Sequence, residues 1–461
     1  MIDNAISLKL ERFYTEMTAV LSNEYQVYHY KNVLLSEIAI KFFLNQYINS
    51  TALINEIGTV ETNQEWEKLL QKYVLKFKIK ISFFQKLKFT AYDLIRYLSY
   101  FFKVKLQFSE ADYYFFITNK KFINYTKGIR ESLENKGVKS GLLIWENDYS
   151  DDEIKSISNT PKVAFPHFWK KNYFQYRNYN HLVDRVLGYN SFFGAKKIIL
   201  IEGCVLSEHI VGEVCKSLSI ETVCLQWGFF AKTVTQSGWR EMPFDKFFVW
   251  GDFYKKNFGE YNSLPIVAIG HPNLNHSANY TKNKVVLFAV QKVMGDHITH
   301  SDIMNFIDYA IFFAQKNPEF KVIIRSHPDF KIPEDRKEAS KNLKNVLWHD
   351  YYKYTLSQSF EEAKYCVSIS STVSLESITF NCYPIFVKAN ELPLQLHEIF
   401  KENNGFNHVF DYNSFENELL KLENKQLIEY IATLKKEIYK SLGNEAIGNI
   451  VNEIVKTTQY K

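Results

Sequence analysis

The sequence predicts an α/β protein built from two Rossmann-like domains that face a cleft, preceded by a helical region. Three observations indicate this fold. Short apolar runs that end in polar residues alternate with stretches of helical periodicity, which is typical of buried parallel strands and their crossover helices. The alternation occurs in two successive series along the chain. A chain of 461 residues is also too long for a single ordinary core.

The first region, 1–107, has apolar residues at helical spacing and few turn signals, as in the stretch 34–48. Its second half is basic and aromatic, and between Lys72 and Lys105 the single acid is Asp93. Such a stretch is typical of a segment that lies on an anionic membrane surface, or of a helical subdomain with a basic outer face. The sequence leaves both interpretations open.

The two Rossmann-like domains are predicted at 108–275 and 284–400, with a polar connection between them. The clearest βαβ unit of the first domain has strands at 196–203 and 221–228, joined by a helix at 206–218. The remaining segment, 401–461, returns to helical periodicity, and we expect C-terminal helices there.

Composition excludes several function classes. The formal charge of +5, from 56 Lys and Arg against 51 Asp and Glu, is too slight to indicate nucleic acid as a partner. The five cysteines include no C-x-x-C pair, which predicts buried thiols in a reducing compartment. The N-terminus lacks a signal-peptide pattern, and no apolar run is long enough for a membrane span. We expect a cytoplasmic protein that is at most peripheral at the inner face of the membrane.

Polar residues directly after apolar strands are the candidate site residues, because ligands of open α/β sheets bind at the carboxyl ends of the strands. In the second domain, the strand at 321–324 is followed by Arg325, Ser326, His327 and Pro328. Arg and His can donate hydrogen bonds or charge to a phosphate, and Pro328 fixes the backbone that presents the ring. A histidine packed in a loop is the alternative interpretation.

A second cluster follows the strand near 365–369. Ser370, Ser371 and Thr372 stand at the start of a helix, where hydroxyls and unpaired backbone N–H groups can converge on a phosphate. Glu376 is one helical turn further on and could accept hydrogen bonds from ribose hydroxyls. The alternative is a plain helix cap, because Ser and Thr are preferred at that position whatever the function.

The first domain offers its own strand-end residues. Glu202 is a carboxylate at the position where a general base or nucleophile would have to be. Gln226, Gly228 and His271 follow two later strands and are candidates for substrate binding. No G-x-x-x-x-G-K-S/T loop, no strand-end G-x-G-x-x-G and no D-x-D are present. We therefore expect chemistry without a metal and without a cofactor other than the donor substrate.

Read in order, the motifs E-G, Q-W-G, V-W-G, G-H-P, R-S-H-P and S-S-T-x-x-x-E resemble those of bacterial GT-B glycosyltransferases that build capsule and lipopolysaccharide. The resemblance covers 113–388. An H-P motif followed by paired serines is similar to enzymes that use CMP-activated 3-deoxy-ulosonic acids, namely Kdo transferases and bacterial sialyltransferases. It implies that His327, Ser370 and Ser371 bind the donor phosphate and that Glu376 lies near the nucleoside.

The resemblance implies an enzyme that moves a Kdo-like or sialic acid-like sugar from its CMP donor to a glycan or lipid-linked glycan acceptor. The second domain would bind the nucleotide, with Arg325 and His327 neutralising the departing phosphate, and the first domain would hold the acceptor. An acid of the first domain would serve in catalysis, and Glu202 is selected by position.

Three alternatives remain at this stage. CDP-glycerol and CDP-ribitol transferases of teichoic acid synthesis also carry H-P and S-S elements. A sugar-nucleotide epimerase can share the same two-domain fold. A non-catalytic nucleotide- or glycan-binding protein would bind without consuming a donor.

Overall fold

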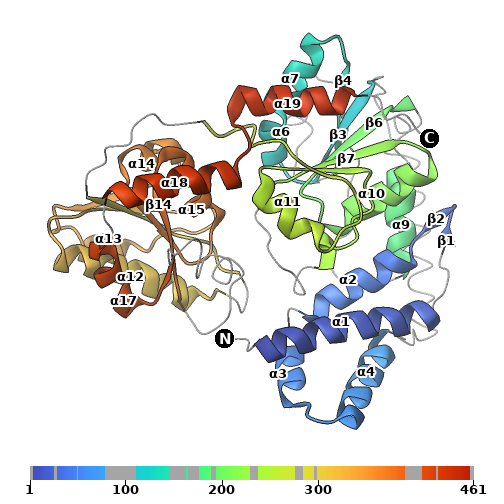
Figure 1. Ribbon diagram of the computed structural model, residues 1–461, viewed down its shortest axis with the longest axis horizontal. Helices are drawn as coiled ribbons and strands as arrows, with labels where there is room; N and C mark the ends of the chain where they lie inside the picture. The colour runs from blue at the N-terminus through green and yellow to red at the C-terminus, as the bar shows by residue number, and fades with distance from the viewer. Residues whose placement is uncertain are drawn as a thin grey trace.

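A computed structural model describes residues 4–24, 29–48, 50–77, 111–145, 162–164, 176–187, 194–228, 237–275, 284–294, 298–389, 408–421 and 424–456. Two parallel sheets form two lobes, and a group of N-terminal helices lies beside the first lobe (Figure 1). The predicted α/β architecture with two Rossmann-like sheets and N-terminal helices is confirmed.

The N-terminal helices have their own core. The elements are α1 (Asn4–Glu24), β1 (His29–Tyr30), β2 (Val33–Leu34), α2 (Ser36–Ile48), α3 (Thr51–Thr59) and α4 (Asn63–Phe77). Phe13 of α1 packs edge-on against Trp66 and Tyr73 of α4, with ring centroids 6.4 and 5.3 Å away. Residues 78–105 of the basic and aromatic stretch lie outside the described residues, so its two interpretations stay open.

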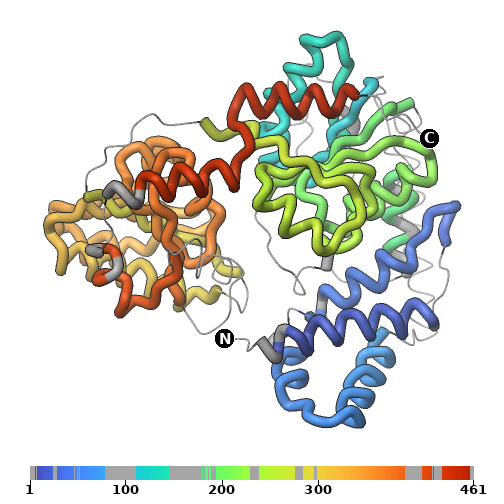
Figure 2. Tube along the Cα trace, in the orientation of Figure 1, coloured from blue at the N-terminus to red at the C-terminus, as the bar shows by residue number. Residues whose placement is uncertain are grey.

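The N-terminal helices run beside the first lobe (Figure 2). Two buried cations join them to it. The Lys41 ammonium of α2 donates to the carbonyl of Glu241 at 2.7 Å. The Arg240 guanidinium pairs with the carboxylate of Glu11 in α1 at 2.6 Å. Each cation has an oxygen partner across the contact, so the packing of the helices on the first lobe leaves neither buried charge uncompensated.

The first sheet has seven parallel strands in the order β5-β4-β3-β6-β7-β8-β9. The strands are β3 (Tyr113–Ile117), β4 (Ser140–Ile144), β5 (Lys162–Ala164), β6 (Lys197–Ile201), β7 (Glu221–Leu225), β8 (Lys246–Val249) and β9 (Ile266–Ala268). The connections contain α6 (Lys121–Tyr125), α7 (Lys127–Asn135), α9 (Tyr176–Leu187), α10 (Leu206–Ser217), η2 (Ser237–Trp239) and α11 (Asp252–Gly259). The central strands β3, β6 and β7 are buried along their full length because helices cover both faces, and their polar residues stand only at the start of β6 and β7.

The second sheet has six parallel strands in the order β12-β11-β10-β13-β14-β15. They are β10 (Val285–Ala289), β11 (Lys321–Arg325), β12 (Val346–His349), β13 (Tyr365–Ser368), β14 (Tyr383–Val387) and β15 (Val409–Phe410). Its helices are α12 (His300–Lys316), α13 (Glu334–Ala339), α14 (Leu356–Glu362), α15 (Thr372–Glu376), η3 (Ser377–Phe380), α17 (Tyr412–Lys421) and α18 (Asn424–Ile438). The segment 401–461, where the sequence predicts helices alone, therefore also contributes an edge strand.

The C-terminal chain links the two lobes, running from α18 on the second lobe to α19 (Gly443–Val455) on the first (Figure 1). At the crossing, the N–H of Lys440 donates to the carbonyl of Trp250 at 2.8 Å, and the N–H of His271 donates to that of Ser441 at 2.9 Å. Gly270 has φ +116°, and a side chain there would collide with Ser441.

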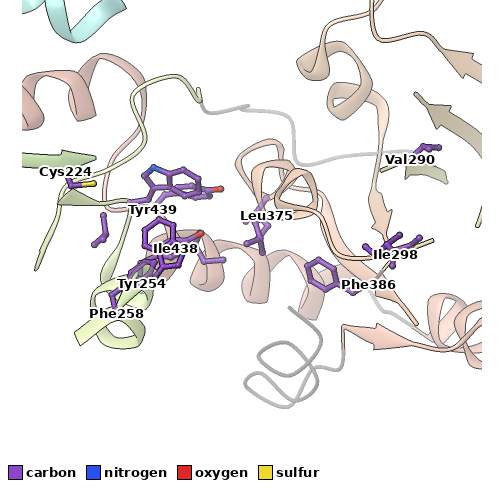
Figure 3. Close-up of a cluster of buried hydrophobic side chains, with 14 of the residues drawn as sticks. Cys224, Tyr254, Phe258, Val290, Ile298, Leu375, Phe386, Ile438 and Tyr439 are labelled. Atoms are coloured by element: carbon purple, nitrogen blue, oxygen red, sulfur yellow. The ribbon is translucent and has the colours of Figure 1, made fainter. Parts of the chain in front are cut away.

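Apolar packing at the crossing is continuous between the lobes. Tyr254 and Tyr439 gather on the side of the first lobe, and Leu375 lies toward the second sheet (Figure 3). All three belong to one buried cluster that includes residues of both sheets. Among the described residues, no helix combines the length and the apolar character needed to cross a membrane.

Candidate active site

Each sheet has one topological switch point, where the strand order reverses. In the first sheet it lies between β3 and β6, and in the second between β10 and β13. Ligands of doubly wound sheets bind outside the carboxyl ends of the strands at this point. The residues that follow these four strands, and those that follow the neighbouring β7 and β11, therefore define the candidate site.

Glu202 follows β6 directly at the first switch point. Its backbone has φ +95°, a conformation that non-glycine residues rarely adopt, and its side chain is half-buried. Burial raises the pKa of the Glu202 carboxyl, and the positive charges of Lys121 and Lys292 act in the opposite direction. A carboxyl with a raised pKa in a strained strand-end turn has the properties of a general base.

Lys121, which the sequence reasoning missed, lies beside Trp227 of the Q-W-G motif. The Lys121 ammonium lies 4.7 Å from the centroid of the Trp227 ring, in a cation–π contact. Phe122 and Tyr125 hold the other sides of the Trp227 ring, at centroid distances of 5.1 and 4.9 Å. The available signal was position, because Lys121 opens the helix after β3 and Trp227 follows β7.

At the second switch point, a buried glutamine joins two strand ends. The Gln291 amide, just after β10, donates to the carbonyl of Ser370 at 2.9 Å and accepts from its N–H at 2.5 Å. Ser371 is the N-cap of α15, and its hydroxyl accepts from the N–H of Val373 at 3.3 Å. The cap interpretation of Ser371 is therefore confirmed, while Ser370 is held by its main chain.

His327 follows β11 and is half-buried, with 29% of its side chain exposed. Its Nδ1 accepts from the N–H of Asp329 at 3.0 Å, so in the neutral ring the proton is on Nε2. Burial lowers the pKa of His327, the charge of Asp329 opposes this, and Lys292 and Lys121 lower the pKa further. The ring is therefore a neutral Nε2–H donor beside two cations.

These groups interact between the lobes. Burial lowers the pKa of Lys121, which also responds to the charges of Glu202 in its own lobe and of Lys292 and Asp329 in the second. The pKa of His327 responds in turn to Lys121. The pKa values of the predicted residues Glu202 and His327 thus respond to the same two lysines, which the sequence reasoning did not select.

Arg325 lies apart from this group. It is 5% exposed, and its Nη1 donates to the carbonyls of Tyr354 and Thr355 at 2.9 and 3.3 Å and to the Ser359 hydroxyl at 3.1 Å. The guanidinium therefore holds the loop before α14. This differs from the expectation that Arg325 meets a phosphate, while Pro328 is exposed beside His327.

Gln226 and His271 also differ from the expected ligand-binding roles, because both are buried in the first lobe. The Gln226 amide donates to the carbonyl of Gly228 at 2.9 Å and accepts from the N–H of Trp250 at 2.9 Å. His271 packs on Trp250, with ring centroids 4.5 Å apart, and burial lowers its pKa to about 3. Their polar groups form hydrogen bonds with backbone groups of the loops at the crossing, and the carbonyl of Gly228 is one of the acceptors.

Glu376 lies at the end of α15, one turn after Thr372. Burial raises the pKa of Glu376 to about 7, and a hydrogen bond from the Thr372 side chain acts in the opposite direction. Burial raises the pKa values of Tyr254 and Tyr439, and the charge of Glu376 raises them further, which places this carboxyl toward the crossing of the C-terminal chain. Within the described residues, no group of three or more His, Cys, Asp or Glu could hold a metal ion.

Comparison with solved structures identifies the architecture. A UDP-N-acetylglucosamine 2-epimerase aligns with a TM-score of 0.52 and 10% identity, over 77% of this chain and 99% of that chain. The chain has the GT-B fold. The epimerase of Neisseria meningitidis bound to UDP-GlcNAc aligns with a TM-score of 0.49 and 12% identity, over 74% of this chain and 98% of that one. The lipopolysaccharide outer core galactosyltransferase WaaB has a TM-score of 0.48 and 13% identity, over 74% and 98%.

No protein-family model matches the sequence, and no curated protein matches it significantly. The GT-B fold accounts for two sheets with matching switch points and for a C-terminal chain that returns to the first lobe. The fold by itself assigns no substrate, because one fold supports many reactions. The residues at the two switch points therefore determine which reaction this fold supports.

Proposed function

We propose that this protein is a glycosyltransferase that moves a 3-deoxy-ulosonic acid, of the Kdo or sialic acid kind, from its CMP donor to a surface glycan or glycolipid acceptor. One observation carries the proposal: the pKa of a carboxyl group at one switch point, Glu202, responds to the same lysines as that of a histidine beside the other, His327. Such an arrangement supports transfer between two substrates held by different lobes.

The donor side of the proposal rests on the second lobe. The Nε2–H of His327 donates to a phosphate oxygen, and Lys292 supplies positive charge in the role that the sequence assigned to Arg325. Ser370 and Ser371 line the same switch point, and Gln291 fixes the main chain between them and β10. Glu376 would contact the nucleoside after a local rearrangement of α15.

The acceptor side rests on Glu202. Its carboxylate takes the proton of the attacking acceptor hydroxyl while the new bond to the anomeric carbon forms. The bond from that carbon to the phosphate oxygen breaks, and CMP leaves with the electron pair. Lys121 and Lys292 then stabilise the negative charge on the phosphate. The raised pKa of Glu202 is closer to neutral pH, and a general base is most effective when its pKa lies near the pH at which it works.

Ligand-induced stabilisation tests the donor nucleotide directly. CMP, CDP, UDP and GDP are added in turn, and thermal unfolding is followed. CMP at a hundred times its dissociation constant should stabilise the fold by about 2.7 kcal/mol. Glu202→Gln should keep this stabilisation but lose transfer by about 10²-fold or more. Stabilisation by UDP with no response to CMP would refute the CMP donor.

Product analysis separates the related reactions. A CDP-glycerol or CDP-ribitol transferase also releases CMP but leaves phosphate in its product. A protein that binds nucleotide yet consumes no donor with any glycan acceptor would be a binding protein. Kdo and sialic acid donors are tried with lipid-linked acceptors. The basic stretch 72–105 supports a position of the enzyme at the inner face of the cytoplasmic membrane.

The second candidate function is a sugar-nucleotide epimerase, which the fold similarity to a UDP-N-acetylglucosamine 2-epimerase favours. An epimerase needs no acceptor, so conversion of UDP-GlcNAc by the protein alone would establish it. In that reaction, Glu202 and Lys121 would exchange a proton with the sugar ring rather than activate a hydroxyl.

A further inference from the structure

The turn after β6 has positive φ at two consecutive residues, and only the first of them, Glu202, is strained by it. Glu202 has φ +95° and Gly203 has φ +90°. A residue other than glycine in such a conformation costs about 1 to 3 kcal/mol and persists only where its surroundings hold it. Gly203 is required, because a Cβ atom there would lie 2.8 Å from the sulfur of Cys224. The candidate general base therefore stands on a turn that other residues must maintain.

Two buried side chains in the first turn of α10 bind both peptide groups of Gly203. The Glu208 carboxyl accepts from the N–H of Gly203 at 2.7 Å. The Nε2 of His209 lies 3.1 Å from the carbonyl oxygen of Gly203 and 2.8 Å from that of Gly238. Because both partners of Nε2 are carbonyl oxygens, Nε2 carries the proton and donates to them. Glu208 and His209 are both fully buried.

The pKa shifts of Glu208 and His209 follow from their burial. Burial raises the pKa of Glu208 well above its ordinary value, and the nearby charge of Glu202 raises it further. Burial likewise lowers the pKa of His209, with Lys41 adding to the effect, so its ring is neutral. Burial also raises the pKa of Glu202, and the charges of Lys121 and Lys292 act in the opposite direction.

We propose that Glu208 and His209 are positioning residues, which hold the Glu202–Gly203 turn in its strained conformation and so aim the Glu202 carboxylate at the acceptor. This inference rests on the proposed function of Glu202. Without the two hydrogen bonds, the turn relaxes toward negative φ and the carboxylate moves away from its substrate. A displacement of about 1 Å at a reacting group can cost about 10²-fold in rate.

Substitutions at Glu208 separate positioning from proton transfer. Glu208→Leu removes the acceptor of the Gly203 N–H, and kcat should fall about 10²-fold while KM for the donor changes less than about threefold. Glu208→Gln keeps an acceptor oxygen and should restore most of the rate, with an unchanged pH profile. Glu213→Leu, on the same helix but paired toward Lys216, is the matched control and should keep wild-type kcat.

His209 provides a second variant if Glu208→Leu fails to fold. The His209 ring packs edge-on against Phe42 and Phe244, at centroid distances of 5.1 and 5.8 Å. His209→Phe therefore keeps the ring contacts and loses only the N–H donor. We expect kcat to fall about tenfold, with nucleotide-induced stabilisation unchanged.

Two outcomes would overturn the inference. Wild-type kcat in both Glu208→Leu and His209→Phe would show that the turn needs no support. A Glu208→Gln variant as slow as Glu208→Leu would show that Glu208 itself exchanges a proton. Failure of the wild-type protein to turn over any donor would instead refute the proposed function. In that case crystal structures still decide, because φ at residue 202 should become negative only in the unsupported variants.

Discussion

Two loops of this protein share a His-Pro pair and the same local hydrogen bond to its histidine. His271 follows β9 in the motif G-H-P, and His327 follows β11 in the motif S-H-P. In both loops the Nδ1 atom accepts from the N–H two residues further on, at 3.2 Å from Asn273 and 3.0 Å from Asp329. The same local hydrogen bond therefore holds Nδ1 of both rings, although only the first loop has a positive φ before its histidine, at Gly270.

Their surroundings differ completely. His271 is 7% exposed and lies between Tyr125, Trp250 and Tyr439, where the C-terminal chain crosses to the first lobe. In the part of the chain that the structure describes, His327 keeps 29% of its side chain exposed and lies within the electrostatic reach of lysines from both lobes. One histidine packs a crossing and the other faces a candidate site. The comparison teaches that the motif sets the turn, while the chain packed against it sets the role.

The largest expected effect is that of His327→Ala on activity. Loss of a preorganised donor at a departing phosphate should lower kcat about 10³-fold, equal to about 4 kcal/mol of transition-state stabilisation. The free energy of unfolding should change by less than about 1 kcal/mol, because the ring is only half-buried. Steady-state kinetics and urea unfolding check both values. Near-normal kcat in His327→Ala would show that His327, like His271, has no role in catalysis.

The next effect is that of His271→Ala on stability. Truncation leaves a cavity among three aromatic rings and should lower the free energy of unfolding by about 3 kcal/mol. His271→Phe fills the space and should cost about 1 kcal/mol, and the folded fraction of either variant should keep its kcat within about threefold. Urea unfolding with activity per folded molecule checks this. A selective loss of kcat would place His271 in the active site.

Arg325→Met sharpens the comparison, because Arg325 is two residues from His327 yet bonded elsewhere. The carbonyls of Tyr354 and Thr355 lose their donor, so the free energy of unfolding should fall by about 2 kcal/mol. The dissociation constant for CMP should change less than about threefold. A calorimetric titration measures this dissociation constant. A tenfold increase in the variant would indicate that Arg325 does bind the phosphate.

The smallest effect is a pH dependence of stability. The pKa of His271 in the fold, about 3, lies below its ordinary value of 6.5, so below pH 6.5 the unfolded chain binds a proton that the fold excludes. The His271 contribution is therefore fully present above about pH 6.5 and is lost as the pH falls toward 3. Between pH 6.5 and 5, the loss should be about 1.5 kcal/mol.

Urea unfolding at several pH values measures this contribution. The His271→Phe variant should lose less stability over the same range, because it has no titrating ring at the crossing. His327 should contribute a smaller slope, since its ring remains partly exposed. Equal slopes for wild type and His271→Phe would contradict the assignment.

The sequence by itself determined the architecture. Strands such as β6 and β7 are apolar except for Lys197 in the first and Glu221 and Thr222 in the second, which is typical of a parallel sheet covered on both faces. It also located Glu202, His327 and Ser370, because strand-end positions follow from the same alternation. Only the tertiary structure decided which polar residues meet. Lys121 and Lys292 are about 170 residues apart in sequence, and the approach of two lobes brings them to one site.

Tertiary structure also decided which candidates are satisfied elsewhere. Arg325, Gln226 and His271 occupy strand ends as expected, yet each is covered by a loop or by the returning C-terminal chain. The physical reason is that a buried polar group must find a partner, and that partner comes from chain remote in sequence. The local sequence pattern predicts which polar side chains follow a strand, and long-range packing determines which groups they hydrogen-bond.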